Sequence, residues 1–279
     1  MSAVGYDSVP WDLGALLAVK QLAADAGPEG VKHPVRVSGL VGATAGGFSG
    51  GTLASLLGAL DDPASRGMSG AHALVPGWSG PNPAPQMSAR FCAPARRWTL
   101  PSIMAAVNEK VVARSAALAP DTYGPGFAYS EATIAPNAIG AFIGTALMGV
   151  GALALALPPS RWLLNKTLLP QPGQGPSEAA REGGRFSAHH VAEDASVPPR
   201  RAYARLAVRG ADPGYKGTSI MAAEAALCLA LQRDELPGRA GGCLTPATCF
   251  GEVLAARLRK HGFDIAARAM APDETVPDA

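Results

Sequence analysis

Three polar side chains in the second half of the sequence are candidates for chemistry. Tyr215 follows an Asp-Pro-Gly turn at the entrance of a predicted helix, where its hydroxyl could protonate a substrate carbonyl as a general acid. Arg205 lies in an alternating segment, and its guanidinium could bind a phosphate or carboxylate bidentately. Glu224 falls on a predicted apolar helical stripe, where a carboxylate is costly unless it pairs with an arginine or faces a ligand. Each residue also has a purely structural alternative. Tyr215 could pack within its turn, Arg205 could belong to a salt-bridged sheet face, and Glu224 could form an ion pair.

The sequence has no pattern typical of metal binding or of nucleophilic catalysis. His189 and His190 are adjacent on a predicted strand, so they point to opposite faces and make no metal site alone. The cysteines show no metal-type pairing and fit a reducing compartment; they are Cys92, Cys228, Cys243 and Cys249. With no sulfur-, serine- or carboxylate-centred constellation, the residues are consistent with hydride chemistry led by a cofactor.

Composition narrows the class of protein further. A chain of 279 residues can bury a substantial core as one large or two small domains. Charged residues make up 16% and the net charge is +2, without a basic block, which argues against nucleic-acid binding. The N-terminus lacks the basic and then apolar pattern of a signal peptide. We therefore expect an intracellular protein.

A glycine-rich segment over residues 35–60 organises the first part of the chain. It reads as an apolar strand, a glycine turn and a helix, which is the outline of a dinucleotide-binding loop. The spacing argues against that function, because no second strand with an acidic end follows within about 20 residues. The alternative is a tight strand-to-helix turn in which Thr52 caps the helix. We therefore expect no residue of the chain to cradle a pyrophosphate.

Two further segments stand out by composition. Residues 61–97 are rich in Pro, Gly and Ser and should lack regular structure, either as a lid over a substrate groove or as a surface excursion. Residues 138–157 contain no charge and are long enough to span a bilayer core. Basic and aromatic residues follow that apolar run, as they do at membrane interfaces. The run is therefore expected either to contact a membrane or lipid surface or to be buried in a core or subunit interface.

The remaining patterns predict the elements that carry these residues. Asp12 is expected to cap a first helix. Residues 101–118 are expected to form a second helix, with Met104, Val107, Val111 and Leu118 on one side. Residues 121–134 read as extended, residues 185–193 and 200–209 as a hairpin, and 217–233 as a helix with Ile220, Leu227 and Leu231 beside Glu224. Thr245 should cap a last helix ending at Gly262, with a frayed tail after Met270. The fold class is α+β, with a mixed, largely antiparallel sheet and flanking helices rather than a complete Rossmann domain.

Several motifs in order along the chain carry a family resemblance. The chain resembles the middle and C-terminal part of the saccharopine dehydrogenase-like oxidoreductases, the family that includes trans-acting enoyl reductases. The matching segments are residues 5–14 (GYDSVPWDLG), 46–55 (GGFSGGTLAS), 170–177 (PQPGQGPS), 212–219 (DPGYKGTS) and 241–247 (GGCLTPA). Family members begin with a Rossmann domain carrying a Gly-Ala-Thr-Gly fingerprint, and this sequence has none ahead of Gly5.

The resemblance implies a function and a set of site residues. It implies an NAD(P)-dependent oxidoreductase that acts on a hydrophobic, lipid-linked or enoyl-thioester substrate, with the cofactor held mainly by a domain absent from this sequence. The nicotinamide side would be formed by Gly5, Tyr6, Asp7, Ser8 and Pro10. The substrate side of the same cleft would be lined by Gly47, Ser49, Gly50, Gly51 and Thr52, beside the separate candidates Arg205 and Glu224.

The resemblance also organises the chain into parts and leaves rival functions open. Residues 1–33 would be the junction to a nucleotide-binding domain, 34–270 a substrate-side and oligomerisation domain, and 271–279 a tail. A homodimer and a membrane or lipid-droplet surface are the expected partners. One rival is a non-catalytic membrane-associated adaptor. The other is a lysine-pathway dehydrogenase, which would need a polar, basic pocket that this poorly charged sequence disfavours.

Overall fold

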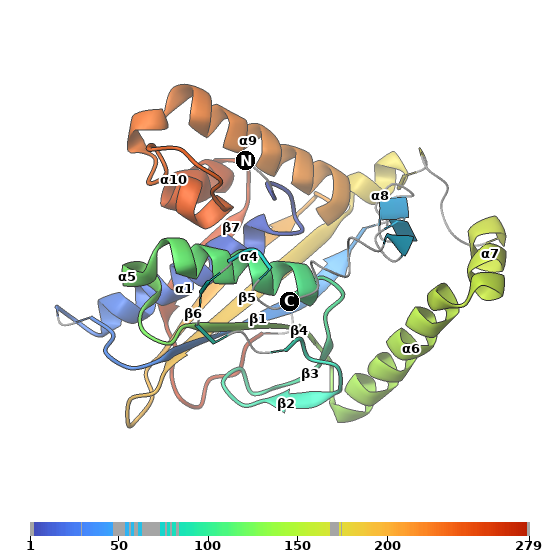
Figure 1. Ribbon diagram of the computed structural model, residues 1–279, viewed down its shortest axis with the longest axis horizontal. Helices are drawn as coiled ribbons and strands as arrows, with labels where there is room; N and C mark the ends of the chain where they lie inside the picture. Colours follow the sequence, from blue (N-terminus) through green and yellow to red (C-terminus); the bar gives the residue numbers. More distant parts are fainter. Residues whose placement is uncertain are drawn as a thin grey trace.

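A single mixed sheet runs through the described part of the molecule (Figure 1). The computed structural model describes residues 3–28, 30–46, 54–55, 57–58, 61–62, 73–75, 77–78, 80–81, 84–167, 173 and 175–277. Seven strands of these residues pair in the order β2-β3-β4-β1-β5-β6-β7. They are β1 (Val35–Ala45), β2 (Arg90–Cys92), β3 (Arg97–Pro101), β4 (Ala128–Ile134), β5 (Arg185–Asp194), β6 (Arg201–Arg209) and β7 (Asp264–Ala269). Only β1 and β4 pair in parallel among them, so the predicted α+β class with a largely antiparallel sheet is confirmed.

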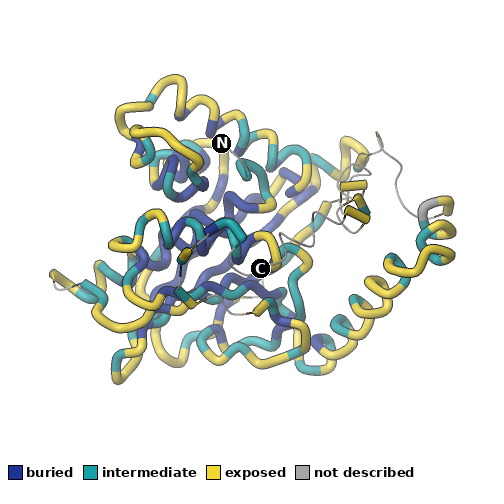
Figure 2. The backbone as a smooth tube through the Cα atoms, in the orientation of Figure 1, coloured by how far each residue is buried: buried dark blue, intermediate teal, exposed yellow. Residues whose placement is uncertain are grey.

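Helices cover one face of this sheet. They include α1 (Val9–Asp25), α4 (Ala105–Leu118), α5 (Pro120–Tyr123), α9 (Thr218–Leu231) and α10 (Pro246–Lys260), and all five contribute to the main core (Figure 2). Three further helices, α6 (Ala138–Ala156), α7 (Pro158–Thr167) and α8 (Glu178–Glu182), lie toward one side of the molecule (Figure 1). A π-helical turn, η1 (Pro213–Gly217), precedes α9, and a 3-10 turn, η2 (Arg233–Glu235), follows it.

Helix α1 is the centre of the core. Twelve of its residues are buried, and they include side chains on every side of the helix. This is typical of a helix enclosed on all sides, because an amphipathic surface helix keeps one polar face. Residues 9–25 therefore pack as an integral part of the sheet domain, although the sequence assigned them to a junction.

The opposite face of the sheet is covered in part by the C-terminal segment. Met270 and Val276 pack with Leu40, Val191 and Tyr203 in a second, smaller core. The Val276 N–H donates to the Ala95 carbonyl at 3.1 Å, and the Arg97 Nε donates to the Val276 carbonyl at 2.6 Å. The expectation of a frayed tail after Met270 was therefore wrong for residues 271–277, and strand β7 had not been predicted.

Local sequence signals placed several elements correctly. Strand β1, the β5–β6 hairpin and the alternation of β6 are confirmed, with Ala204 and Leu206 in the main core and Tyr203 on the other face. Thr245 caps α10 through a capping box, as predicted from Thr245 and Pro246. His189 and His190 point to opposite faces, since His190 contacts Trp11 of α1 whereas His189 contacts Tyr203.

Other predictions were wrong because the partner surface was unknown. Residues 90–92 form strand β2 within the segment expected to be irregular, and residues 120–123 form helix α5 where extended chain was expected. Val107 and Leu118 of α4 are exposed, while the buried face of α4 carries polar Asn108, Glu109 and Ser115. On α9, Leu227 and Leu231 are exposed, and Glu224 is buried beside Met221 and Cys228 instead.

The tail predicts a simple stability test. Val276→Ala should lower the free energy of unfolding by about 2 kcal/mol, because it removes two buried methyl groups and leaves a cavity in the second core. Val107→Ala, an exposed position on α4, is the matched control and should change it by less than about 0.5 kcal/mol. Urea unfolding followed by circular dichroism measures the free energy of unfolding of both variants. Equal changes in the two variants would show that packing of Val276 does not stabilise the fold.

Candidate functional site

Segments far apart in the sequence meet at the end of β1. The Tyr6 N–H donates to Thr218 Oγ1 at 3.0 Å, which joins the start of the chain to the start of α9. A Cβ atom on Gly5 would lie 2.9 Å from the Thr218 side chain, and one on Gly46 would lie 2.9 Å from Asp212 and Pro213. Glycine therefore permits both close approaches. Three of the motifs singled out in the sequence are brought together at this edge.

The turn before α9 is held by one buried carboxylate. Asp212 accepts hydrogen bonds from the backbone N–H groups of Tyr215 and Lys216, each at 2.9 Å. This fixes Tyr215 at the edge, with its hydroxyl next to Gly175, where a Cβ atom would lie 2.7 Å from the hydroxyl oxygen. The segment around residue 175 therefore reaches the same place, and Tyr215 stays a half-buried candidate there.

Tyr6 places a second hydroxyl at this edge. Burial raises the pKa of Tyr6 to about 12, although a side-chain hydrogen bond with Thr44, near the end of β1, acts to lower it. The ring packs edge-on against Phe186 of β5, with the ring centres 4.7 Å apart. Tyr6 is therefore a neutral hydrogen-bonding phenol throughout the physiological pH range. Asp7, next along the chain, is exposed, whereas Ser8 and Pro10 are buried.

A buried hydrogen-bonded chain lies below this edge. Ser8 Oγ donates to Asn108 Oδ1 at 3.3 Å, and Asn108 Nδ2 donates to Glu131 Oε2 at 2.8 Å. Ser102 Oγ donates to the other oxygen of Glu131 at 2.6 Å, while Glu109 Oε1 accepts the Glu131 N–H at 3.0 Å. Burial raises the pKa of Glu131 and that of Glu109 to about 7 each. This site therefore holds carboxyl groups that change protonation near neutral pH.

Asp12 forms a separate buried network that joins three helices. Its Oδ1 accepts a hydrogen bond from Ser115 of α4 at 2.5 Å, and its Oδ2 accepts the Ala247 N–H of α10 at 2.7 Å. Ser115 and Thr245 share a further bond at 2.6 Å. Burial raises the pKa of Asp12 to about 6. The expected N-cap role was therefore wrong, because the helix begins at Val9 and Asp12 instead contacts the N-terminal end of α10.

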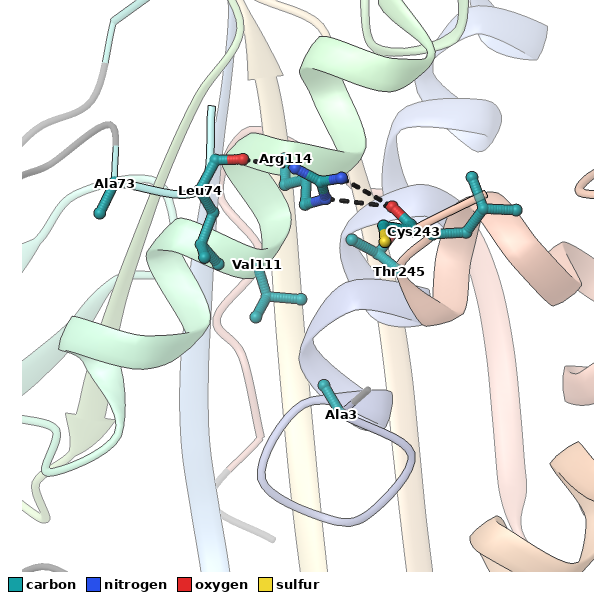
Figure 3. A pocket seen from close by; sticks show the side chains of 8 residues that line it. Ala3, Ala73, Leu74, Val111, Arg114, Cys243 and Thr245 are labelled. Atoms are coloured by element: carbon teal, nitrogen blue, oxygen red, sulfur yellow. Dashed lines mark hydrogen bonds between the residues drawn. The ribbon is translucent and has the colours of Figure 1, made fainter. Parts of the chain in front are cut away.

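A pocket of about 360 Å³ opens beside this network (Figure 3). Arg114 of α4 lines it and donates to the carbonyls of Leu74 and Cys243, at 2.5 and 2.7 Å. Its guanidinium thus holds two loops together, and Figure 3 shows it directed at both carbonyl oxygens. The pocket is also lined by Ala3, Ala73, Val111, Leu244 and Thr245.

The other predicted site residues lie elsewhere or outside the described residues. Arg205 pairs with Asp264 at 2.9 Å and belongs to the sheet face opposite α1, away from Tyr6 and Ser8. Glu224 pairs with Arg257 of α10 at 2.5 Å and with His261 at 2.8 Å, so the ion-pair alternative describes it. The candidates Gly47, Ser49, Gly50, Gly51 and Thr52 lie outside the described residues. Among the residues that are described, no group of three or more His, Cys, Asp or Glu could hold a metal ion.

Sequence reasoning missed the buried acids. Glu131 lies in an otherwise uncharged strand segment, AYSEATI, and a carboxylate there needs partners for the same reason as Glu224. That signal was available. The sequence did not reveal its partners, because Asn108 comes from helix α4 and Ser102 from the segment before that helix.

Comparison with known proteins finds mycobacterial relatives named trans-acting enoyl reductases. The chain is 37% identical over 284 residues to Rv2449c of Mycobacterium tuberculosis (strain ATCC 25618 / H37Rv), which is provisionally so named, covering 94% of this chain and 65% of that protein. It is 30% identical over 284 residues to a trans-acting enoyl reductase of Mycobacterium ulcerans (strain Agy99), covering 95% of this chain and 66% of that protein. The chain thus spans just under two thirds of the length of these relatives. No family model and no solved structure matches it. The relatives support an enoyl-reductase-like family.

The raised pKa of Glu131 predicts a pH-dependent stability. In the folded state the Glu131 carboxyl keeps its proton up to about pH 7, whereas an unfolded glutamate releases it near 4.5. The contribution of Glu131 to the free energy of unfolding therefore falls as pH rises between those values. His189 and His190 have pKa values lowered by burial, to about 4 and 3, and act in the opposite direction. Glu131→Gln should therefore remove a slope of up to about 1.4 kcal/mol per pH unit, relative to wild type.

Urea unfolding of both proteins from pH 4.5 to 8 measures this slope. Exposed Glu252→Gln on α10 is the control and should leave the slope unchanged. Parallel curves for Glu131→Gln and wild type would contradict the raised pKa of Glu131 in the folded state.

Proposed function

We propose that this chain is the substrate-side part of a saccharopine dehydrogenase-like oxidoreductase that uses NAD(P)H to reduce an enoyl thioester, carried on a lipid-linked substrate. The observation that carries the proposal is the meeting of residues 5–8, the end of β1 and the turn before α9 at one edge. The similarity to proteins named trans-acting enoyl reductases, over 94% of this chain, supports the reaction class. The substrate class and the cofactor are part of the proposal.

The described residues do not fit a dinucleotide by themselves. The polar groups of the edge already bond to one another, since Tyr6 bonds to Thr218, Ser8 to Asn108, and Asp212 to its own turn. We therefore assign the nucleotide mainly to a separate nucleotide-binding domain, with Gly5 to Pro10 on the nicotinamide side. The reduction would take its hydride from that cofactor.

Within the chain itself, Tyr6 is the strongest candidate to contact substrate. Its phenol stays protonated and lies beside Thr44, near the end of β1. A neutral phenol donates a hydrogen bond to a thioester carbonyl, and such a bond gains strength as negative charge develops on that oxygen. Tyr215 offers a second hydroxyl at the same edge, which makes the two tyrosines separable by mutation.

Substrate binding by the chain tests this function. The chain should bind a long-chain 2-enoyl pantetheine thioester by calorimetry, and Tyr6→Phe should weaken binding about five- to tenfold by removing one hydrogen bond. Tyr215→Phe is the matched control, because it removes a hydroxyl from the same edge, and a smaller effect is expected. Absence of thioester binding by the folded wild-type chain would contradict the substrate-side role and would favour a non-catalytic adaptor.

A further inference from the structure

Helix α6 (Ala138–Ala156) is apolar on all sides and nearly uncovered. Of its 19 residues only Ala141 is buried, and Ile139 and Leu147 are 72% and 66% exposed. The helix carries no charged side chain, and Figure 2 shows exposed and intermediate residues along its length. A core helix would be mostly buried, which this one is not, and a signal sequence would lie near the N-terminus. A protein partner would cover only one face of the helix, and the other faces could then be polar. A helix that is apolar on every side is therefore better suited to an apolar medium that surrounds it.

The sheet decides how such a helix could meet a membrane. Strand β4 precedes α6 and strand β5 follows it, and both pair with the same strand, β1. If α6 crossed the bilayer once, β4 and β5 would be on opposite sides, which their shared pairing forbids. The return from residue 157 to 184 contains no second apolar run that could cross back. The segment must therefore enter and leave on the same side.

The residues that follow α6 match a lipid headgroup region. Helix α7 (Pro158–Thr167) carries no acidic residue and two basic ones, of which Arg161 pairs with Asp61 at 2.7 Å and Lys166 is exposed. The Lys166 ammonium lies 5.1 Å from the centre of the Trp162 ring, and Trp162 is 63% exposed. Tryptophan and lysine are residues that anchor proteins at membrane interfaces, and the positive charge of Lys166 complements anionic headgroups.

The apolar surface continues onto the neighbouring edge of the sheet. Phe142 of α6 packs against Trp98 of β3, with ring centres 6.1 Å apart, which attaches the helix to that edge. Phe91 of β2, Met87 and Ile103 are exposed nearby in the chain, at or beside the β2–β3 hairpin. Exposed apolar side chains in such number are unusual on a surface that faces only water.

We propose that α6 inserts into one leaflet of an anionic lipid bilayer and that α7 lies in its headgroup region, so that the sheet domain docks on one side of the membrane. The helix is about 28 Å long, which fits a helix lying obliquely or in the plane of one leaflet. This inference is independent of the proposed reaction, because it rests on α6, α7, the neighbouring β2–β3 edge and the strand order.

Vesicle flotation of the folded chain, without detergent, substrate or cofactor, tests the proposal. The chain should float with phosphatidylcholine vesicles and more strongly when phosphatidylglycerol is added. Leu147→Asp with Leu153→Asp should lower the bound fraction at least about tenfold, because carboxylates are placed in the apolar stretch. Leu229→Asp with Leu231→Asp on α9, two comparably exposed leucines outside α6, is the matched control and should leave binding unchanged.

Two further measurements fix the interpretation. Lys166→Glu should abolish the preference for anionic vesicles while leaving binding to neutral vesicles in place. Circular dichroism should show that each variant is folded, which is expected because the substituted side chains are exposed. Failure of the wild-type chain to float with either vesicle would overturn the proposal. A dimer that the α6 variant dissociates, without vesicle binding, would overturn it too and assign α6 to a second copy.

Discussion

The close packing of helix α1 against the middle of the sheet is the constraint on which the rest depends. A Cβ atom on Gly14 would lie 2.1 Å from the His190 ring, so only glycine allows the helix to lie this close to β5. At that distance α1 is enclosed by the sheet below and by α4 and α10 above. The carboxylate of Asp12 is then fully buried and must find its partners on those two helices.

The position of α1 also determines what happens at the edge of the sheet. The N-terminal end of α1 delivers residues 5–8 to the end of β1, where Tyr6 meets Thr218 and Ser8 meets Asn108. Because Asn108 bonds in turn to Glu131, the edge is connected to a buried carboxyl group on the strand next to β1. The candidate site is thus a consequence of core packing rather than a loop feature laid over it.

Helix α6 obeys a different constraint from the rest of the chain. Elsewhere an apolar helix such as α1 is covered by protein, whereas α6 is largely exposed and contacts the sheet near its beginning, where Phe142 packs against Trp98. Because the strands before and after it, β4 and β5, both pair with β1, the chain must enter and leave a membrane on the same side. An apolar helix with that topology is suited to a one-sided lipid contact and cannot be a simple membrane crossing.

The sequence by itself determined the features that depend on neighbouring residues. Alternation identified β6, the Thr-Pro start identified the cap of α10, and an uninterrupted apolar run identified α6. The motifs of the candidate edge were also visible, but nothing in the sequence placed residues 5–8 beside the turn at 212–218. What the sequence could not decide was which surface each helix would bury.

Only the tertiary structure settled those questions, because the deciding partners are distant in the chain. Asp12 reads as a helix cap until Ala247, 235 positions away, supplies the N–H that it binds. The exposed leucines of α9 and the polar buried face of α4 invert the usual apolar pattern for the same reason: Glu224 and Asn108 find partners on other elements. A buried polar group is stable only when its partner is in place, and that partner is specified by the fold.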